Sequence, residues 1–127
     1  MVIRGSSDVQ TQGFEVAELS VAVSGSGDLS VDSLSAAKLD IRVSGSGNVS
    51  ASGAVDHQQI SVRGSGNVDT RGVESRTART SVSGSGHVDV WVTETLEVAL
   101  SGSGDVSYRG NPAVDSSISG SGRLRSQ

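Results

Sequence analysis

A short glycine-rich motif recurs along the chain, and its spacing limits the possible folds more than any other feature. The motif is Ser-Gly-Ser-Gly followed by a polar and an aliphatic residue, with Arg63 replacing the first serine in one copy. The leading glycines are residues 25, 45, 64, 84, 102 and 120, so successive copies lie 18 to 20 residues apart. A decayed copy at residues 5–9 precedes them. A near-constant period of this length is typical of a solenoid, in which one coil is repeated and stacked.

Within a coil, aliphatic residues and glycines share one parity, and polar residues take the other. In the second full coil the first set is Leu39, Ile41, Val43, Gly45, Gly47, Val49 and Ala51. A period of two predicts a β-strand with one buried face. The alternation continues through the motif, which predicts that both glycines of each copy lie on the buried side. Helix is excluded because no 3.6-residue period is present and glycine disfavours helices.

Aligning the coils places similar aliphatic residues at equivalent inward positions. One column is Val23, Val43, Val62, Val82, Leu100 and Ile118, and another is Leu29, Val49, Val68, Val88, Val106 and Leu124. Such ladders predict an all-β fold, a single-stranded parallel β-helix of about six coils with ~20 residues per coil. Residues 1–127 are expected to form this one domain. An antiparallel sandwich would not explain why residues about one coil apart match in kind.

A second corner lies between the strand pairs, and only there does the coil length vary. Its sequences include 32–34, 52–54, 71–73 and 109–112, with Pro112 outside the strand ladder. No coil carries an insertion longer than a residue or two. Enzymes with this architecture usually build clefts from long loops, so the chain is predicted not to be an enzyme.

Composition and charge limit the classes of partner. Hydrophobic residues make up 34% and aromatic residues 2%, as in many disordered chains. Disordered chains do not keep aliphatic residues in phase with a repeat, so a folded chain is expected. The net charge of -4 and the lack of a basic cluster argue against nucleic acid or anionic lipid. No cysteine is present, and neither a signal peptide nor a membrane span is recognised.

The only tryptophan falls in an outward column of the predicted solenoid. The column is Asp32, Ser52, Arg71, Trp91 and Arg109. It would place Trp91 between Arg71 and Arg109, and an arginine over an indole ring is held by cation–π attraction. This arrangement predicts a binding patch of Trp91, Arg71 and Arg109 that contacts a sugar or a protein. The alternative is a stacked ladder that only covers hydrophobic surface.

Other outward columns predict no catalytic, metal or cofactor site. The residues after the second glycine are Asp28, Asn48, Asn67, His87, Asp105 and Arg123. A calcium solenoid would need a carboxylate at every such turn. His87 and Asp105 have no nucleophile to complete a catalytic set. One coil apart, Arg79 and Glu97 are expected to pair, and Asp69 and Asp89 to repel each other.

Several segments in the second half of the chain resemble the head GIN domain family. They are 90–93 (Val-Trp-Val-Thr), Leu96, 100–106, Tyr108, 110–112 (Gly-Asn-Pro), Val114 and 119–123. The family is named for autotransporter adhesins, so the resemblance implies a right-handed β-helix at the bacterial cell envelope or secreted, behind a signal peptide. It supplies no catalytic residues. Family members usually carry further N-terminal strands, and this chain is therefore expected to be a fragment or a shortened member.

Together these features predict a non-enzymatic adhesion or scaffold module of the cell envelope. Its partner is expected to be a cell-surface glycan or protein. The alternative is a carbohydrate-active enzyme, a lyase or hydrolase, which would show carboxylates and basic residues along a groove. Self-association is also expected, through the N-terminal coil, because Arg123 and Arg125 would hinder pairing at the other end.

Overall fold

The computed structural model describes residues 2–5, 8–12 and 15–126, and its regular elements in these ranges are all strands. They are β1 (Val2–Gly5), β2 (Asp8–Gln12), β3 (Glu15–Gly25), β4 (Asp28–Gly45), β5 (Asn48–Gly64), β6 (Asn67–Gly84), β7 (His87–Gly102), β8 (Asp105–Arg109), β9 (Ala113–Gly120) and β10 (Arg123–Ser126). Every described strand pair is parallel. The predicted parallel β-helix is confirmed as a solenoid of about 6 turns with ~19 residues per turn.

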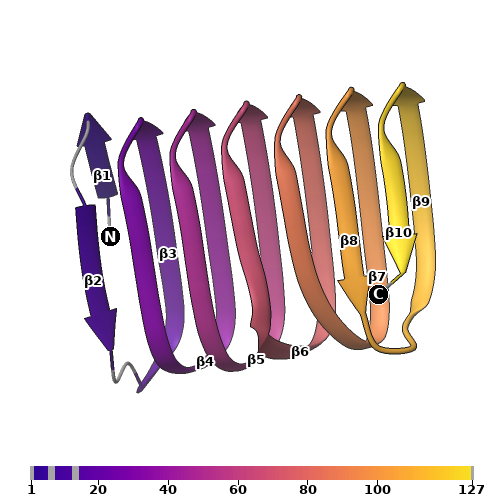
Figure 1. Cartoon of the computed structure of the whole chain (residues 1–127). Helices are drawn as coiled ribbons and strands as arrows, with labels where there is room; N and C mark the ends of the chain where they lie inside the picture. The colour runs from indigo at the N-terminus through magenta and orange to yellow at the C-terminus, as the bar shows by residue number, and fades with distance from the viewer. Residues whose placement is uncertain (1, 6–7, 13–14, 127) are drawn as a thin grey trace.

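Each long strand carries the chain around most of one coil. From β4 to β7 a strand follows one side, bends at the second corner and returns along the other side (Figure 1). The sheet order is β1-β3-β4-β5-β6-β7-β8-β10, with β2 beside β4 and β9 beside β7. Neighbours in space are therefore residues about one repeat apart, as the sequence period predicts.

The two predicted inward columns form as continuous ladders. Val43 is the register partner of both Val23 and Val62, and Val62 also pairs with Val82. The aliphatic side chains of both ladders are almost fully buried through the middle coils. In the last coil Ile118 is 44% exposed, because no described coil stacks on β9. Apolar burial in a solenoid thus depends on both neighbouring coils.

The two glycines of each motif copy play different parts, and the prediction that both are buried is wrong. The first glycine is exposed in every full copy and has φ between 92° and 104°, or 109° in β6. In Gly45 this is the left-handed region, which residues with a Cβ rarely adopt. The second glycine is buried in five of the copies and half-buried at residue 122. The strand alternation is interrupted because the chain turns a sharp corner between the two glycines.

The backbone stays paired across this glycine corner. The Ser46 amide donates to the Gly25 carbonyl at 3.0 Å, and the Asn48 amide donates to the Gly27 carbonyl at 3.1 Å. The same bonds recur in the following coils. Stacked corners therefore satisfy one another's backbone groups, which a buried or stacked turn must do to be stable.

Coil length varies at the second corner, as predicted. The register shifts lie between Val31 and Leu34, between Ser50 and Ser52, and within residues 70–77. Residues 6–7 of the decayed copy lie outside the described ranges, so self-association through the N-terminal coil stays a prediction. Both Arg123 and Arg125 are exposed. Within the described ranges there is no helix that could cross a membrane.

Candidate functional site

The flattened coil has two outer faces, which meet at the glycine corner (Figure 1). The pre-corner face is formed by outward side chains of the runs that end at each motif, in β3, the second parts of β4–β7, and β9. The post-corner face is formed by the runs that follow each motif, in the first parts of β4–β7, β8 and β10. The residues that could contact a partner lie in different patterns on these two faces.

Trp91 and Arg109 form an aromatic–cationic pair on the post-corner face. Trp91 of β7 is the register partner of Arg109 of β8, and the guanidinium carbon lies 4.8 Å from the centre of the indole ring. Arg109 is exposed and Trp91 is half-buried. A cation–π contact at such a site is worth about 0.5–1 kcal/mol. The prediction that these two residues stack is confirmed.

Arg71 does not join that stack, and here the predicted column is wrong. The register shifts after Thr70, so that Glu74 rather than Arg71 lies opposite Trp91. The Arg71 side chain instead donates two hydrogen bonds of 3.1 Å to the Asp69 carboxylate. Arg71 Nε also lies 3.9 Å from Asp89 Oδ2. The expected repulsion between Asp69 and Asp89 is therefore offset by a shared cation.

The Arg71 contact also changes the acidity of Asp69. Side-chain hydrogen bonds from Arg71 hold the pKa of the Asp69 carboxyl below its ordinary value of 3.8, against the opposing effect of partial burial. A lowered pKa contributes stability above the unfolded-state pKa, and this contribution is lost as the pH falls through the folded-state pKa. The Asp69 side chain is 42% exposed, so water screens much of the interaction.

Replacing Asp69 with asparagine is therefore expected to have a small and pH-dependent effect. At pH 7 the free energy of unfolding should fall by less than about 1 kcal/mol, because exposed ion pairs contribute little. The difference should shrink as the pH is lowered towards about 2, because the carboxyl of Asp69 becomes protonated as the pH falls through its folded-state pKa. Urea denaturation at both pH values measures this. An equal loss at both would show that the charge is not the cause.

The first three residues of the column after the second glycine form a ladder of hydrogen bonds. The Asn48 side-chain amide donates to Asp28, and the Asn67 amide donates to Asn48, each at 3.0 Å. His87 Nδ1 lies 3.7 Å from Asp105 Oδ2, too far for a hydrogen bond. In the part of the chain that the structure describes, no group of three His, Asp or Glu side chains could hold a metal ion. From Asp28 to Asn67 this column therefore acts as a structural ladder.

The pre-corner face is hollowed, which the sequence analysis did not foresee. Three hollows of about 440, 500 and 510 Å³ lie along it. Two of them are lined by short outward side chains that follow one another from coil to coil. Ser61 lines the hollow of 510 Å³, and Ser81, Ala99 and Ser117 line the hollow of 440 Å³. Longer side chains beside them form the rims. The sequence feature that could have predicted these hollows is the column of short residues at one outward position.

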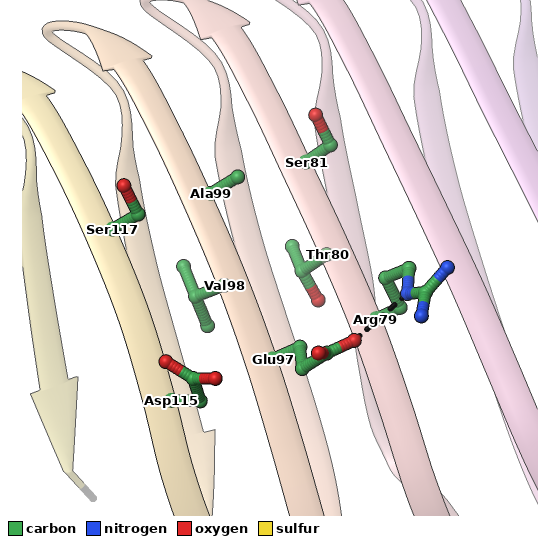
Figure 2. Close-up of a pocket in the computed structure, with 8 residues that line it drawn as sticks. All are labelled: Arg79, Thr80, Ser81, Glu97, Val98, Ala99, Asp115 and Ser117. Carbon is green, nitrogen blue, oxygen red and sulfur yellow. Dashed lines mark hydrogen bonds and ion pairs between the residues drawn. The ribbon is translucent and has the colours of Figure 1, made fainter.

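The hollow nearest the last coil contains the charged groups that a carbohydrate-active enzyme would need. Figure 2 shows Glu97 turned towards Arg79, and the two are joined by a hydrogen bond of 2.8 Å, as the sequence predicts. Asp115 is the register neighbour of Glu97. Glycosidases need one carboxylic acid kept protonated by its surroundings. Glu97 and Asp115 are both exposed to water.

Comparison with known proteins identifies relatives of this architecture. The family model described as "Putative auto-transporter adhesin, head GIN domain" matches residues 1–112. Residues 119–123, part of the tail that carried the resemblance, lie beyond the match. No curated protein matches the chain.

The solved structures that share the coil arrangement include the following three. A putative adhesin from Parabacteroides distasonis has a TM-score of 0.90 and 28% identity over 99% of this chain and 55% of its own. A putative adhesin from Parabacteroides merdae has a TM-score of 0.87 and 25% identity, over 98% and 54%. A putative lipid binding protein from Parabacteroides distasonis has a TM-score of 0.82 and 25% identity, over 99% and 60%. This chain thus spans little more than half the length of these proteins.

The repeated glycine corner, the parallel coils and the match over residues 1–112 agree with one another. The chain belongs to the head GIN domain family.

Proposed function

We propose that this chain is a non-enzymatic adhesion or scaffold module that works at the cell envelope. The names of its family and of two structural neighbours support an adhesive role and a surface location. The open form of the hollows and the exposure of Glu97 and Asp115 support binding over catalysis. The partner is a cell-surface glycan or protein.

The observation that carries the proposal is the half-exposed Trp91 on the post-corner face. Tryptophan and arginine are the residues most enriched where partners are held tightly. Trp91 and Arg109 lie next to each other here, with the Arg109 guanidinium over the indole ring of Trp91. Arg71 borders the same surface, where Asp69 and Asp89 hold it in place. We name Trp91, Arg109 and Arg71 the tryptophan patch and propose it as the contact surface.

The name of the third neighbour raises lipid binding as another class of function. A lipid chain needs an apolar cavity, whereas the interior of these coils is filled by aliphatic side chains that are 0–9% exposed. The described interior therefore gives lipid binding no support.

Trp91→Ala is expected to weaken recognition by the tryptophan patch strongly. A glycan array and a pull-down from envelope extract would compare it with the wild-type chain. Truncating a central tryptophan typically costs about 2 kcal/mol or more, which is roughly 30-fold in affinity. Arg109→Ala should weaken the same interactions, and Arg76→Ala serves as the control because Arg76 pairs with Asp56 at the second corner.

The structural alternative predicts a different result. If Trp91 only covers hydrophobic surface, Trp91→Ala leaves every detected interaction unchanged and lowers the melting temperature alone. That outcome would remove the tryptophan patch as the contact surface.

A further inference from the structure

The repeat is broken at one outward position on the pre-corner face. The residue before the leading glycine is serine in every full copy except the third, where it is Arg63. Arg63 lies between Ser44 and Ser83 in the register. A ladder that is otherwise serine thus carries a single guanidinium, and Arg63 has no ion-pair partner among the residues that the structure describes.

This guanidinium stands at a hollow that contains a second arginine. The hollow has a volume of about 510 Å³, within the range of ligand sites. Its polar lining is Ser24, Arg42, Ser44, Gln59, Ser61 and Arg63. Arg42 is 72% exposed, and its nearest carboxylate, that of Asp40, lies 3.8 Å away. Two guanidiniums and one carboxylate leave the hollow with an excess of one positive charge, although the whole chain is negative.

We propose that this hollow, the arginine hollow, binds an acidic polysaccharide through the oxyanion of one sugar. Guanidinium groups present paired N–H donors that match the two oxygens of a carboxylate or a sulfate. Serine hydroxyls and the Gln59 amide both donate and accept hydrogen bonds, as sugar hydroxyls require. The site lies on the face away from the tryptophan patch, so the inference goes beyond the proposed function and does not depend on it.

The shape of the face favours a chain over a compact anion. From the arginine hollow the short side chains Ser61, Ser81 and Ala99 continue along the solenoid axis towards the hollow at Glu97. There Glu97 and Asp115 outnumber Arg79, so the acidic sugar belongs at the arginine hollow and uncharged sugars of the same chain lie farther along. Coils stack at ~4.8 Å, so an extended chain lying along the axis meets an equivalent side chain at every such step. Two arginines on an acidic protein are too few to hold an anionic membrane surface, where several basic residues act together.

The test is a fluorescence anisotropy titration of the full chain against labelled oligosaccharides. The probes are tetragalacturonate for carboxylate, a sulfated dextran oligosaccharide for sulfate, and maltotetraose as the neutral match. We expect binding to one or both acidic probes and none to maltotetraose. Binding should weaken as NaCl rises, because an exposed charge contact is screened.

Arg63→Ser is the sharpest variant because it restores the residue that the neighbouring coils carry. We expect it to lower affinity for the acidic probe about tenfold or more, as the loss of a charge-assisted contact does. Arg42→Ser together with Arg63→Ser should abolish binding. Arg76→Ser removes the same charge from the second corner and should leave the affinity unchanged, and circular dichroism would check the fold of each variant.

Several results would overturn the proposal. They are equal binding of maltotetraose, unchanged affinity in Arg63→Ser, no binding of either acidic probe, or, in a parallel titration with phosphatidylglycerol vesicles, binding to the vesicles alone. Trp91→Ala should retain acidic-probe binding. The wild-type chain could bind neither acidic probe while Trp91→Ala still loses the partner found on the array or in the pull-down. That result would contradict the proposal for the arginine hollow alone and would leave the proposal for the tryptophan patch unaffected.

Discussion

Val62→Asp is expected to unfold the chain. Val62 is 0% exposed and sits in the inward ladder between Val43 and Val82, where no polar group of the ladder could pair with a carboxylate. Burying an unpaired charge costs several kcal/mol, a large part of the ~5–15 kcal/mol that stabilises an ordinary domain. The measurement is the loss of the β-sheet signal in circular dichroism, followed during urea denaturation.

The control for Val62→Asp is Ser81→Asp, which places the same side chain at an exposed position of the next coil. Surface substitutions of this kind usually change stability by no more than about 0.5 kcal/mol. If both variants unfolded at the same urea concentration, the inward and outward assignment of the strands would be wrong.

Gly66→Ala is expected to produce the second largest loss of stability. A Cβ at this residue would clash with Val43 Cγ1 and would lie 2.7 Å from the Gly47 carbonyl oxygen. Val43 is itself buried, and the carbonyl belongs to the stacked backbone, so neither can move aside easily. Forcing extra atoms into a packed interior costs about 1–3 kcal/mol and sometimes more, and the upper end applies where backbone must shift.

Ser65→Ala is the matched control for the glycine corner, because Ser65 is exposed and directly precedes Gly66. It should unfold at nearly the same temperature as the wild-type chain, while Gly66→Ala unfolds well below it. Equal melting temperatures for the two variants would show that coils do not approach as closely as described.

The sequence was sufficient for the fold because each inward position is repeated in every coil. The partners of Val43 could be predicted by counting one repeat in either direction, and the structure places Val23 and Val62 there. The glycine corner could not be predicted in full. Parity alone cannot distinguish a glycine chosen for its φ, such as Gly45, from one chosen for lack of space, such as Gly66.

The candidate site was harder to predict, and the reason is the variable second corner. Counting along the repeat placed Arg71 beside Trp91, but an irregularity between Thr70 and Glu74 breaks the count. Arg109 follows from the same counting and is correct, because β7 and β8 keep their register. Each hollow depends on the lengths of several neighbouring side chains on three coils. A single outward column gives only one side chain per coil, so it does not predict the hollow.

The residues that we propose for binding are those that depart from the repeat. The stacked coils need only glycine, serine and aliphatic residues, and the outward serines at 44 and 83 show what the structure alone requires at position 63. Arg63 and Trp91 contribute nothing to the ladders that bury the core. This argument joins the two proposed surfaces, although each has its own test.

Acrylamide quenching of tryptophan fluorescence tests the proposed contact surface most directly. The chain contains one tryptophan, so its own tryptophan signal comes from Trp91 alone, and the emission of a protein partner measured by itself is subtracted. The quenching constant would be measured for the free chain and for its complex with the partner recovered by pull-down. We predict weaker quenching in the complex, because a bound partner covers the half-exposed ring. Unchanged quenching in a fully formed complex would show that the partner binds elsewhere and would contradict the proposal.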